Sequence, residues 1–296
     1  MLMRVLVAGS SGLIGSALRS RLRELGHDVV RLVRRAPTAP DERGWHPPSG
    51  RIDENAFDGV DAVVNLCGAS LASGRWSAAR KQVLHDSRIE PTEVLAEAVA
   101  DHGVPVLISA SGINYYGDTG QREVDESAPV GHGFLPRLCA EWEAACAPAS
   151  RAGSRVVFLR TAPVFTWRGG MLAQVRPLFQ LGLGGALGTG RQYLPWISLT
   201  DMVEVIVFCL DNADVSGPVN VASPRPVTNA EFTKAVGRAL RRPTPWRVPG
   251  APLRLLLGEA ADEMLLAGPR AVPGVLLRHG FPYAVEDLDQ ALSPVP

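Results

Sequence analysis

Three glycines near the start of the chain have the spacing of a loop that binds the phosphates of a dinucleotide. Gly9, Gly12 and Gly15 follow an apolar run at residues 4–8 and open a helical pattern at residues 13–25. The first glycine permits a tight turn, the second lets the backbone approach a pyrophosphate, and the third lets helix and strand pack closely. The helix then presents free N–H groups and its positive end to the phosphates. The alternative is an ordinary strand-to-helix turn. The spacing predicts cofactor contacts from Gly9, Ser10, Ser11, Gly12, Leu13, Ile14 and Gly15.

The end of the next predicted strand carries the residues that distinguish NADP from NAD. Proteins that bind NAD place an Asp or Glu there for the ribose 2′-hydroxyl, whereas an arginine accommodates the 2′-phosphate of NADP. Here Val33 stands at the acidic position and is followed by Arg34 and Arg35. A guanidinium binds phosphate through paired, charge-assisted hydrogen bonds. We therefore expect NADP(H) to be preferred over NAD(H), with Arg34 at the 2′-phosphate; the alternative is a pair of solvated arginines.

The elements that must position these residues alternate between strand and helix through the first half of the chain. Short β-branched runs are followed by longer stretches with apolar residues at helical spacing. The predicted strands are residues 4–8, 28–33, 61–66, 104–109 and 155–160, and the predicted helices are residues 13–25, 77–100 and 138–152. Pro91 is expected to break or kink the second helix. The alternation predicts an α/β fold with a Rossmann-type, doubly wound parallel sheet.

The second half of the chain lacks the regular alternation of strand and helix patterns, which predicts a smaller C-terminal substrate lobe. Residues 181–190 are rich in glycine, and Pro and Gly separate the helical patterns beyond residue 249. We expect a nucleotide-binding domain at residues 1–165, to which segments of about 191–222 return. The smaller lobe is expected to comprise residues 166–190 and 223–296.

Two residues near the expected lobe boundary are candidates for the substrate cleft, since binding sites gather at such boundaries. Arg191 and Trp196 either contact substrate or form a structural bridge between the lobes. The leucine-rich run at residues 253–257 is expected to pack against the smaller lobe or to form a dimer contact. The protein is accordingly expected to be a monomer or a homodimer.

Composition argues against several classes of partner and site. Thirty Lys and Arg balance thirty Asp and Glu, so the basic excess typical of nucleic-acid binding is missing and no nucleic-acid partner is expected. The neutral net charge also argues against an anionic membrane, and no run of 18 apolar residues occurs that could form a transmembrane helix, so no membrane partner is expected. The four cysteines form no C-x-x-C pair, which favours reduced thiols and no metal site. Residues 1–9 read directly into a strand rather than a signal peptide, which predicts a cytoplasmic location.

A series of short strings, in order over nearly the whole chain, carries a family resemblance. The strings are residues 65–70, 75–76, 86–89, 109–111, 115–117, 181–192, 195–197, 228–232 and 255–259. With the glycine loop, they resemble the atypical branch of the extended short-chain dehydrogenase/reductase superfamily. This branch is the NAD(P)-dependent epimerase/dehydratase-like family with a C-terminal DUF1731 segment, here about residues 249–296. The resemblance implies a Rossmann fold and cofactor contacts by Leu66, Cys67, Gly68, Arg88 and Pro163.

Ordinary members of that superfamily use a Ser-Tyr-Lys set assisted by an Asn, and this chain lacks part of it. Matching to the family pattern places Leu135 where the Tyr would be and Cys139 where the Lys would be. Ser111 retains the serine, and Arg88 falls where the Asn would be. This pattern resembles the atypical branch itself.

Two interpretations of the retained residues remain open. In the functional one, Arg88 supplies a positive charge and contacts the cofactor, Ser111 orients a substrate carbonyl, and Tyr115 or Tyr116 donates a proton. In the other, Arg88 only contacts the cofactor, Ser111 ends a strand and the tyrosines pack. The resemblance favours an NADP(H)-binding oxidoreductase or epimerase-like protein with an unidentified small carbonyl or hydroxyl substrate. The alternative is a non-catalytic NADP(H)-binding sensor or scaffold protein.

Overall fold

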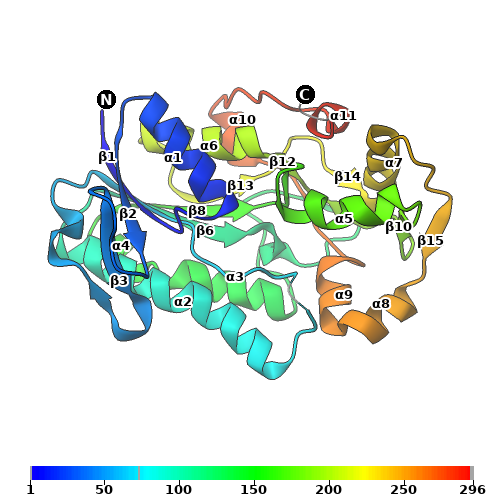
Figure 1. Ribbon diagram of the computed structural model, residues 1–296, viewed down its shortest axis with the longest axis horizontal. Coiled ribbons are helices and arrows are strands. Elements are labelled where there is room, and N and C mark those ends of the chain that lie inside the picture. Colours follow the sequence, from blue (N-terminus) through cyan, green and yellow to red (C-terminus); the bar gives the residue numbers. More distant parts are fainter. Residues whose placement is uncertain (1, 73, 294–296) are drawn as a thin grey trace.

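A computed structural model, which describes residues 2–72 and 74–293, has a central sheet with helices on both faces (Figure 1). Across these residues the eight strands of the sheet follow the order β13-β8-β6-β5-β1-β2-β3-β4. They are β1 (Arg4–Ala8), β2 (Asp28–Val33), β3 (Glu42–His46), β4 (Arg51–Ile52), β5 (Ala62–Asn65), β6 (Val106–Gly112), β8 (Arg155–Thr161) and β13 (Gly217–Val221). Every neighbouring pair is parallel except β3 with β4. The predicted doubly wound α/β fold is confirmed.

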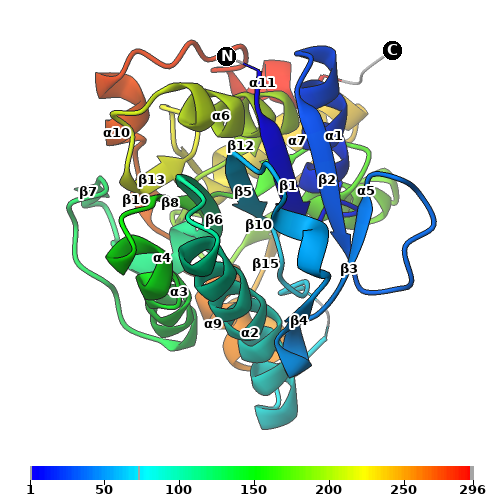
Figure 2. The same ribbon diagram turned by 90° about the vertical axis from the view of Figure 1, so that its left-hand side faces the viewer.

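Alternate residues of the central strands pack on opposite faces of the sheet. Val5 and Val7 of β1 join a core with α1 (Leu13–Glu24) and α6 (Leu199–Asp211). Leu6 and Ala8 join a second core with α2 (Ala78–Asp101) and α4 (Ala147–Arg151). Figure 2 shows the two helical layers, with α1 and α6 above the sheet and α2, α3 (Phe134–Ala144) and α4 below it. Because both faces are covered, β1 is apolar at almost every position instead of alternating.

Of the break or kink expected at Pro91, the break is not observed, because α2 runs through this residue from Ala78 to Asp101. Proline removes one helical hydrogen bond, at a cost of about 3 kcal/mol. Packing offsets this cost, since Leu84, Leu95 and Val99 on both sides of the proline are fully buried. The Thr92 hydroxyl also donates to the Arg88 carbonyl at 2.7 Å within the same turns.

The smaller lobe is built from short elements that pack beside the carboxyl edge of the sheet. Its helices are α5 (Gly170–Gln180), α7 (Asn229–Leu240), α8 (Gly250–Leu257) and α9 (Glu259–Met264). Strand β10 (Gly185–Leu187) pairs with β15 (Trp246–Val248), and β11 (Tyr193–Leu194) pairs with β14 (Val227–Thr228). Two further pairs are β9 (Val164–Phe165) with β12 (Ile197–Ser198) and β7 (Glu123–Val124) with β16 (Arg270–Ala271). Single 3₁₀ turns occur at Pro47–Ser49, Glu54–Phe57 and Ile113–Tyr116.

The chain returns to the sheet after it has formed the smaller lobe. Val275 and Leu276 of α10 (Gly274–Arg278), followed by Phe281, join the core between the sheet and α6. The last described helix is α11 (Leu288–Ala291). The C-terminal segment therefore contributes residues to the core beside the sheet. Of the helices in residues 2–72 and 74–293, none has both the length and the hydropathy to cross a bilayer.

Candidate functional site

The glycine loop between β1 and α1 has the geometry that the spacing predicts. Gly9 has φ +77°, and a Cβ there would lie 2.7 Å from the Leu66 carbonyl oxygen. A Cβ on Gly15 would lie 2.3 Å from the Gly9 carbonyl oxygen. Gly12 has φ −72° and no such clash, since its Cβ would lie 3.4 Å from the nearest atom, so the fold alone does not require glycine there. In dinucleotide-binding loops, the glycine at this position lets the pyrophosphate approach the backbone closely.

The start of α1 is open to an anion. Gly12 is the N-cap residue, so no side chain caps this helix, and the first turn carries no acidic residue. Ser10 is buried within the loop, and Ser11 is exposed beside it. The N–H groups of the first turn and the positive end of the helix dipole are therefore free to receive phosphate.

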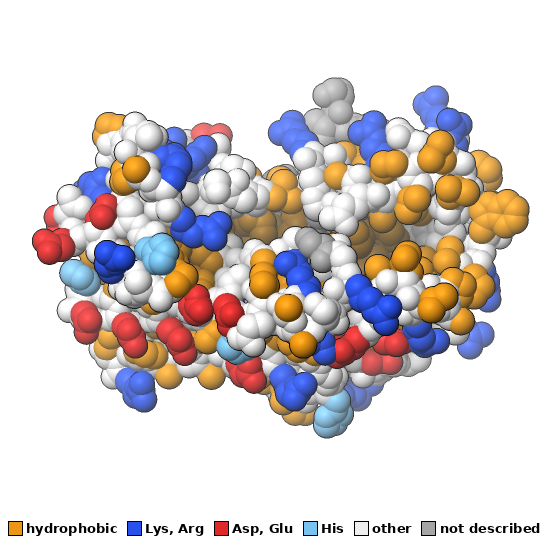
Figure 3. Space-filling view, turned by 60° about the horizontal axis from the view of Figure 1, so that its bottom comes forward, with side chains coloured by type: hydrophobic (Ala, Val, Ile, Leu, Met, Phe, Trp, Pro, Cys, Tyr) orange, Lys and Arg blue, Asp and Glu red, His pale blue; other side chains and the backbone are white. Residues whose placement is uncertain are grey.

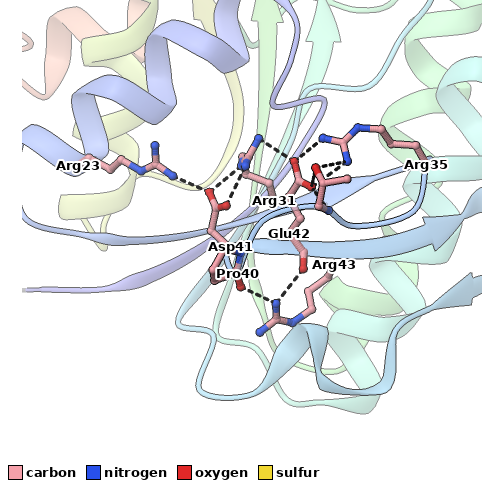
Figure 4. A network of polar contacts seen from close by, with 8 residues as sticks. Arg23, Arg31, Arg35, Pro40, Asp41, Glu42 and Arg43 are labelled. Atoms are coloured by element: carbon pink, nitrogen blue, oxygen red, sulfur yellow. Dashed lines mark hydrogen bonds and ion pairs between the residues drawn. The ribbon is translucent and has the colours of Figure 1, made fainter.

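The two arginines after β2 have different surroundings. The Arg35 guanidinium binds the buried Glu42 of β3 through both terminal nitrogens, at 2.9 and 2.5 Å (Figure 4). Hydrogen bonds from Arg35 lower the pKa of Glu42 to about 2, and the Thr38 N–H contributes at 2.7 Å. Arg34 is exposed, and within the described chain no carboxylate lies within 4 Å of its guanidinium. Arg35 is thus held by the protein, whereas Arg34 is available to a ligand.

Arg34 and the loop that follows β5 lie at the same edge of the sheet. Strands β2 and β5 both pair in parallel with β1, so the residues after each of them leave the sheet at its carboxyl edge. Burial raises the pKa of the Cys67 thiol in this loop to about 12, so the thiol is uncharged at neutral pH. The candidate 2′-phosphate ligand therefore shares this edge with predicted cofactor contacts.

A cavity of about 220 Å³ lies at the carboxyl ends of β5, β6 and β8. It is lined by Ile14, Leu66, Cys67, Gly68, Leu71, Arg88, Ala110, Ser111, Gly112, Asn114, Leu135, Leu138, Cys139, Trp142, Thr161 and Met202. The cavity brings together six residues that the sequence predicted as site residues: Ile14, Leu66, Cys67, Gly68, Arg88 and Ser111. On the molecular surface, Figure 3 shows an apolar hollow between the two parts of the molecule.

Arg88 is a buried cation in the wall of this cavity. It donates to the carbonyl oxygens of Leu84 at 2.9 Å and Ala69 at 3.0 Å. Its guanidinium lies 5.1 Å from the Trp142 ring, and a Cβ on Gly68 would lie 3.4 Å from its Cζ. Burial lowers the pKa of Arg88 to about 10, so it stays protonated at neutral pH. No carboxylate in residues 2–72 and 74–293 lies within 4 Å of it.

Ser111 donates its proton away from the cavity. Its hydroxyl binds Glu143 Oε1 at 2.7 Å, and the Glu143 carboxylate in turn pairs with Arg160 at 2.8 and 2.9 Å. The serine therefore offers an oxygen lone pair to a ligand, which differs from the expected donor to a carbonyl. The sequence analysis missed Glu143 and Arg160. The available signal was helical spacing, because Glu143 lies one turn after Cys139 on α3.

The structure does not bring Tyr115 or Tyr116 into the cavity wall. The Tyr116 hydroxyl donates to Asn220 Oδ1 at 2.7 Å and accepts from Arg160 Nη1 at 2.9 Å. Burial raises the pKa of Tyr116 to about 12. Tyr115 lies with its ring 3.5 Å from the Arg160 guanidinium. These contacts favour a packing role for both rings over the expected role as proton donor.

Leu135 and Cys139 of α3 line the cavity. They are the residues that match the Tyr and Lys positions of ordinary family members, so neither the proton donor nor the cation of that set is present. Cys139 is buried, and burial raises the pKa of its thiol to about 12, so the thiol stays protonated at neutral pH. A thiol in this state is a poor nucleophile. Among the described residues no cluster of His, Cys, Asp and Glu suits a metal ion.

Three other predicted residues lie outside the cavity. Trp196 is fully buried, stacks on Phe165 at 5.6 Å and donates its indole N–H to the Arg225 carbonyl at 3.2 Å. Of its two expected roles, these contacts favour the structural one over a substrate contact, because the ring is part of a hydrophobic core. Arg191, the other candidate for substrate contact, is exposed and does not line the cavity. Pro163, a predicted cofactor contact, also lies outside the cavity lining, and its carbonyl oxygen accepts a hydrogen bond from the Ile197 N–H at 3.1 Å.

Comparison with known proteins places this geometry in a family. The sequence profile of the NAD dependent epimerase/dehydratase family matches residues 5–222, and that of a domain of unknown function, DUF1731, matches residues 248–295. An epimerase family protein of Mycobacterium bovis is 54% identical over 289 residues, which cover 98% of this chain and 96% of that protein.

Two solved structures are similar over nearly all of this chain. The human epimerase family protein SDR39U1, crystallised with NADPH, has 32% identity and a TM-score of 0.88, with 98% of each chain covered. A nucleoside-diphosphate sugar epimerase from Corynebacterium glutamicum has 34% identity and a TM-score of 0.81, with 99% of this chain and 57% of that chain covered. The resemblance carried by the sequence strings is thus confirmed, and the chain belongs to the NAD dependent epimerase/dehydratase family with a C-terminal DUF1731 segment.

Proposed function

We propose that the chain binds NADP(H), in preference to NAD(H), at the carboxyl edge of its central sheet. Gly9 and Gly15 lie where any side chain would displace backbone, as is typical of a loop that receives a pyrophosphate. Arg34 is exposed and free of carboxylates in the described chain, and Val33 offers no acceptor for a ribose 2′-hydroxyl. The NADPH in the human relative supports the same cofactor here.

The residues present fit this cofactor. The N–H groups at the start of α1 would hold the pyrophosphate, and Arg34 would hold the 2′-phosphate. The cavity wall at Leu66, Gly68 and Arg88 would contact the remainder of the cofactor. When bound, NADP(H) supplies hydride transfer to or from a substrate carbon. The protein supplies binding, orientation and charge.

We further propose an oxidoreductase or epimerase-like activity on a small carbonyl or hydroxyl substrate. The observation that carries this proposal is a buried Arg88 that shares a cavity with Ser111 and has no carboxylate partner in the described chain. A buried, unpaired charge is unfavourable, so the cavity favours ligands with an anionic or polar group near Arg88. Ser111 accepts a hydrogen bond from a substrate hydroxyl, because its own proton is donated to Glu143.

The activity is tested by substrate-dependent oxidation of NADPH and reduction of NADP⁺ across a panel of small carbonyls and alcohols. Cofactor affinity is measured in parallel by calorimetry, so that binding and turnover are separated. Turnover with one panel member that falls in Ser111→Ala, while NADPH affinity is kept, supports catalysis at this cavity.

A non-catalytic NADP(H)-binding sensor or scaffold is the second candidate function. Leu135 and the protonated thiol of Cys139 favour it, since they stand in the cavity wall where a proton donor of suitable pKa is needed. This function predicts NADPH binding without turnover across the panel. It also predicts that NADPH changes the rate of limited proteolysis, because a sensor must respond to its ligand.

A further inference from the structure

Four large apolar side chains are exposed together at the end of the smaller lobe. Leu178, Leu181 and Leu183 lie in the last turn of α5 and the loop after it, with exposed fractions of 51%, 74% and 60%. Trp246 of β15 is 61% exposed, and its indole N–H donates to the Gly182 carbonyl at 3.2 Å, which holds the ring beside this loop. We call these four side chains the Trp246 surface. They form an apolar patch on the surface that is not buried in any hydrophobic core.

An open hollow of about 460 Å³ adjoins this surface and is lined mostly by cations. Its charged lining residues are Lys234, Arg238, Arg241 and Arg242, at the end of α7 and just beyond it. Arg242 Nε donates to the Gln180 carbonyl at 3.1 Å, which joins the hollow to the end of α5. Arg238 pairs with Asp289, but within the described residues no carboxylate lies within 4 Å of the other three. The hollow is therefore a site of uncompensated positive charge.

The charges of the chain are segregated, although the whole chain is neutral. Residues 166–200 and 232–258 contain no Asp or Glu, and they carry nine of the thirty Lys and Arg. These two segments supply the Trp246 surface and the hollow, which lie at the end of the smaller lobe where β10 pairs with β15 (Figure 1). Hydrophobic and basic side chains accordingly gather at the right-hand end of Figure 3.

The α8 helix, which follows β15 along the chain, exposes two further leucines. Leu255 and Leu256 are 80% and 72% exposed, and no residue of the helix is buried. Of the leucines in residues 253–257, Leu257 packs against a cluster that contains Leu135 and Ala260, so the expected packing is observed only at the end of α8. A twofold dimer contact at this face is also unfavourable, because it would bring the same unpaired cations of two copies together.

We propose that this face binds the surface of a bilayer that contains anionic phospholipids. The cation-lined hollow receives headgroup phosphate, and the Trp246 surface enters the boundary between headgroups and acyl chains. Exposed Trp and Leu beside Arg and Lys are typical of proteins that lie on a membrane, where area burial and charge attraction add. Nucleic acid explains the cations but leaves the exposed leucines without a role. The expectation of no membrane partner used whole-chain charge and apolar run length, which do not describe this local surface.

The test is co-sedimentation of the full chain with vesicles of phosphatidylcholine alone and with vesicles that also contain phosphatidylserine. We expect binding to the mixed vesicles only, and weaker binding at high salt. Arg241→Gln and Arg242→Gln should each weaken binding about fivefold, from roughly 1 kcal/mol per basic residue at an anionic surface. The double variant Leu181→Ser/Leu183→Ser should weaken it by about tenfold or more, since two exposed apolar side chains are lost.

Matched controls lie on other parts of the molecule. Leu277→Ser replaces a leucine of α10 that is 51% exposed, and Arg151→Gln replaces an exposed arginine of α4. Both should bind the mixed vesicles as the wild type does. NADPH affinity should be unchanged in all of these variants, which checks that each is folded and separates this proposal from the proposed cofactor site.

Several results would overturn the proposal. Equal binding to both kinds of vesicle, or unchanged binding in the Arg241, Arg242 and double leucine variants, would exclude the charged and apolar contacts named here. If vesicles do not bind but a labelled DNA duplex does, the cations serve nucleic acid. If sedimentation velocity shows self-association that Leu181→Ser/Leu183→Ser abolishes, and vesicles do not bind, the face is a dimer interface.

Discussion

Replacing Arg34 by alanine should remove most of the preference for NADPH over NADH. Arg34 is exposed, and it has no carboxylate within 4 Å in the described chain, so a phosphate displaces no ion pair when it binds. A hydrogen bond to a charged group is worth about 1.5–3 kcal/mol, which corresponds to roughly tenfold to over a hundredfold in Kd. Because the site is open to water, we expect the lower end of this range.

The neighbouring arginine provides a matched control. The Arg35 guanidinium is already bound to Glu42, so Arg35→Ala should leave the ratio of NADPH to NADH affinity unchanged. It should instead lower the Tm, because the buried carboxylate of Glu42 loses its main partner. The two variants remove the same charge from adjacent positions, so an effect of net charge alone would appear in both.

The assay is calorimetric titration of the wild type and the two variants with NADPH and with NADH, at low and moderate salt. The preference of the wild type should fall as salt rises, since an exposed contact is screened. A parallel loss of NADH and NADPH affinity in Arg34→Ala would refute the assignment of this residue to the 2′-phosphate. Loss of the NADPH preference in Arg35→Ala would show that Arg35 contacts the 2′-phosphate, although it is paired with Glu42.

Three further outcomes are expected. Gly15→Ala should lower both the Tm and NADPH affinity, because its Cβ would lie 2.3 Å from a loop carbonyl oxygen, whereas Gly12→Ala should lower NADPH affinity with little change in Tm. Arg88→Ala should weaken NADPH binding by roughly tenfold, while Ser111→Ala leaves it intact; unchanged affinity in Arg88→Ala would remove this arginine from the cofactor site. The pKa of Glu42 is about 2 when folded against an ordinary 4.5, so its stabilisation is complete above the ordinary value and is lost as pH falls from there toward 2. Glu42→Gln should flatten that part of the Tm-against-pH curve, and an unchanged slope would contradict the pairing.

The sequence by itself determined the parts of this protein that depend on neighbouring residues. The apolar run of β1 and the helical spacing of α1 predict a strand and a helix, because periodicity is a property of one contiguous segment. The glycine spacing predicts the loop between them, since the backbone turn at Gly9 and the close packing at Gly15 are both local needs. The alternation of such units was enough to predict the doubly wound sheet.

Only the tertiary structure decided which side chains are available to a ligand. The sequence assigned the 2′-phosphate to Arg34 by its position alone, whereas the structure shows that Glu42 on the neighbouring strand holds Arg35. Ser111 has the expected position at the end of β6, yet its proton goes to Glu143 on α3. The same holds for surfaces, because unpaired cations and exposed leucines gather in the smaller lobe although the chain as a whole is neutral. Hydrogen-bond pairing and burial depend on distances between segments that lie far apart along the chain, and these distances exist only after the elements have packed.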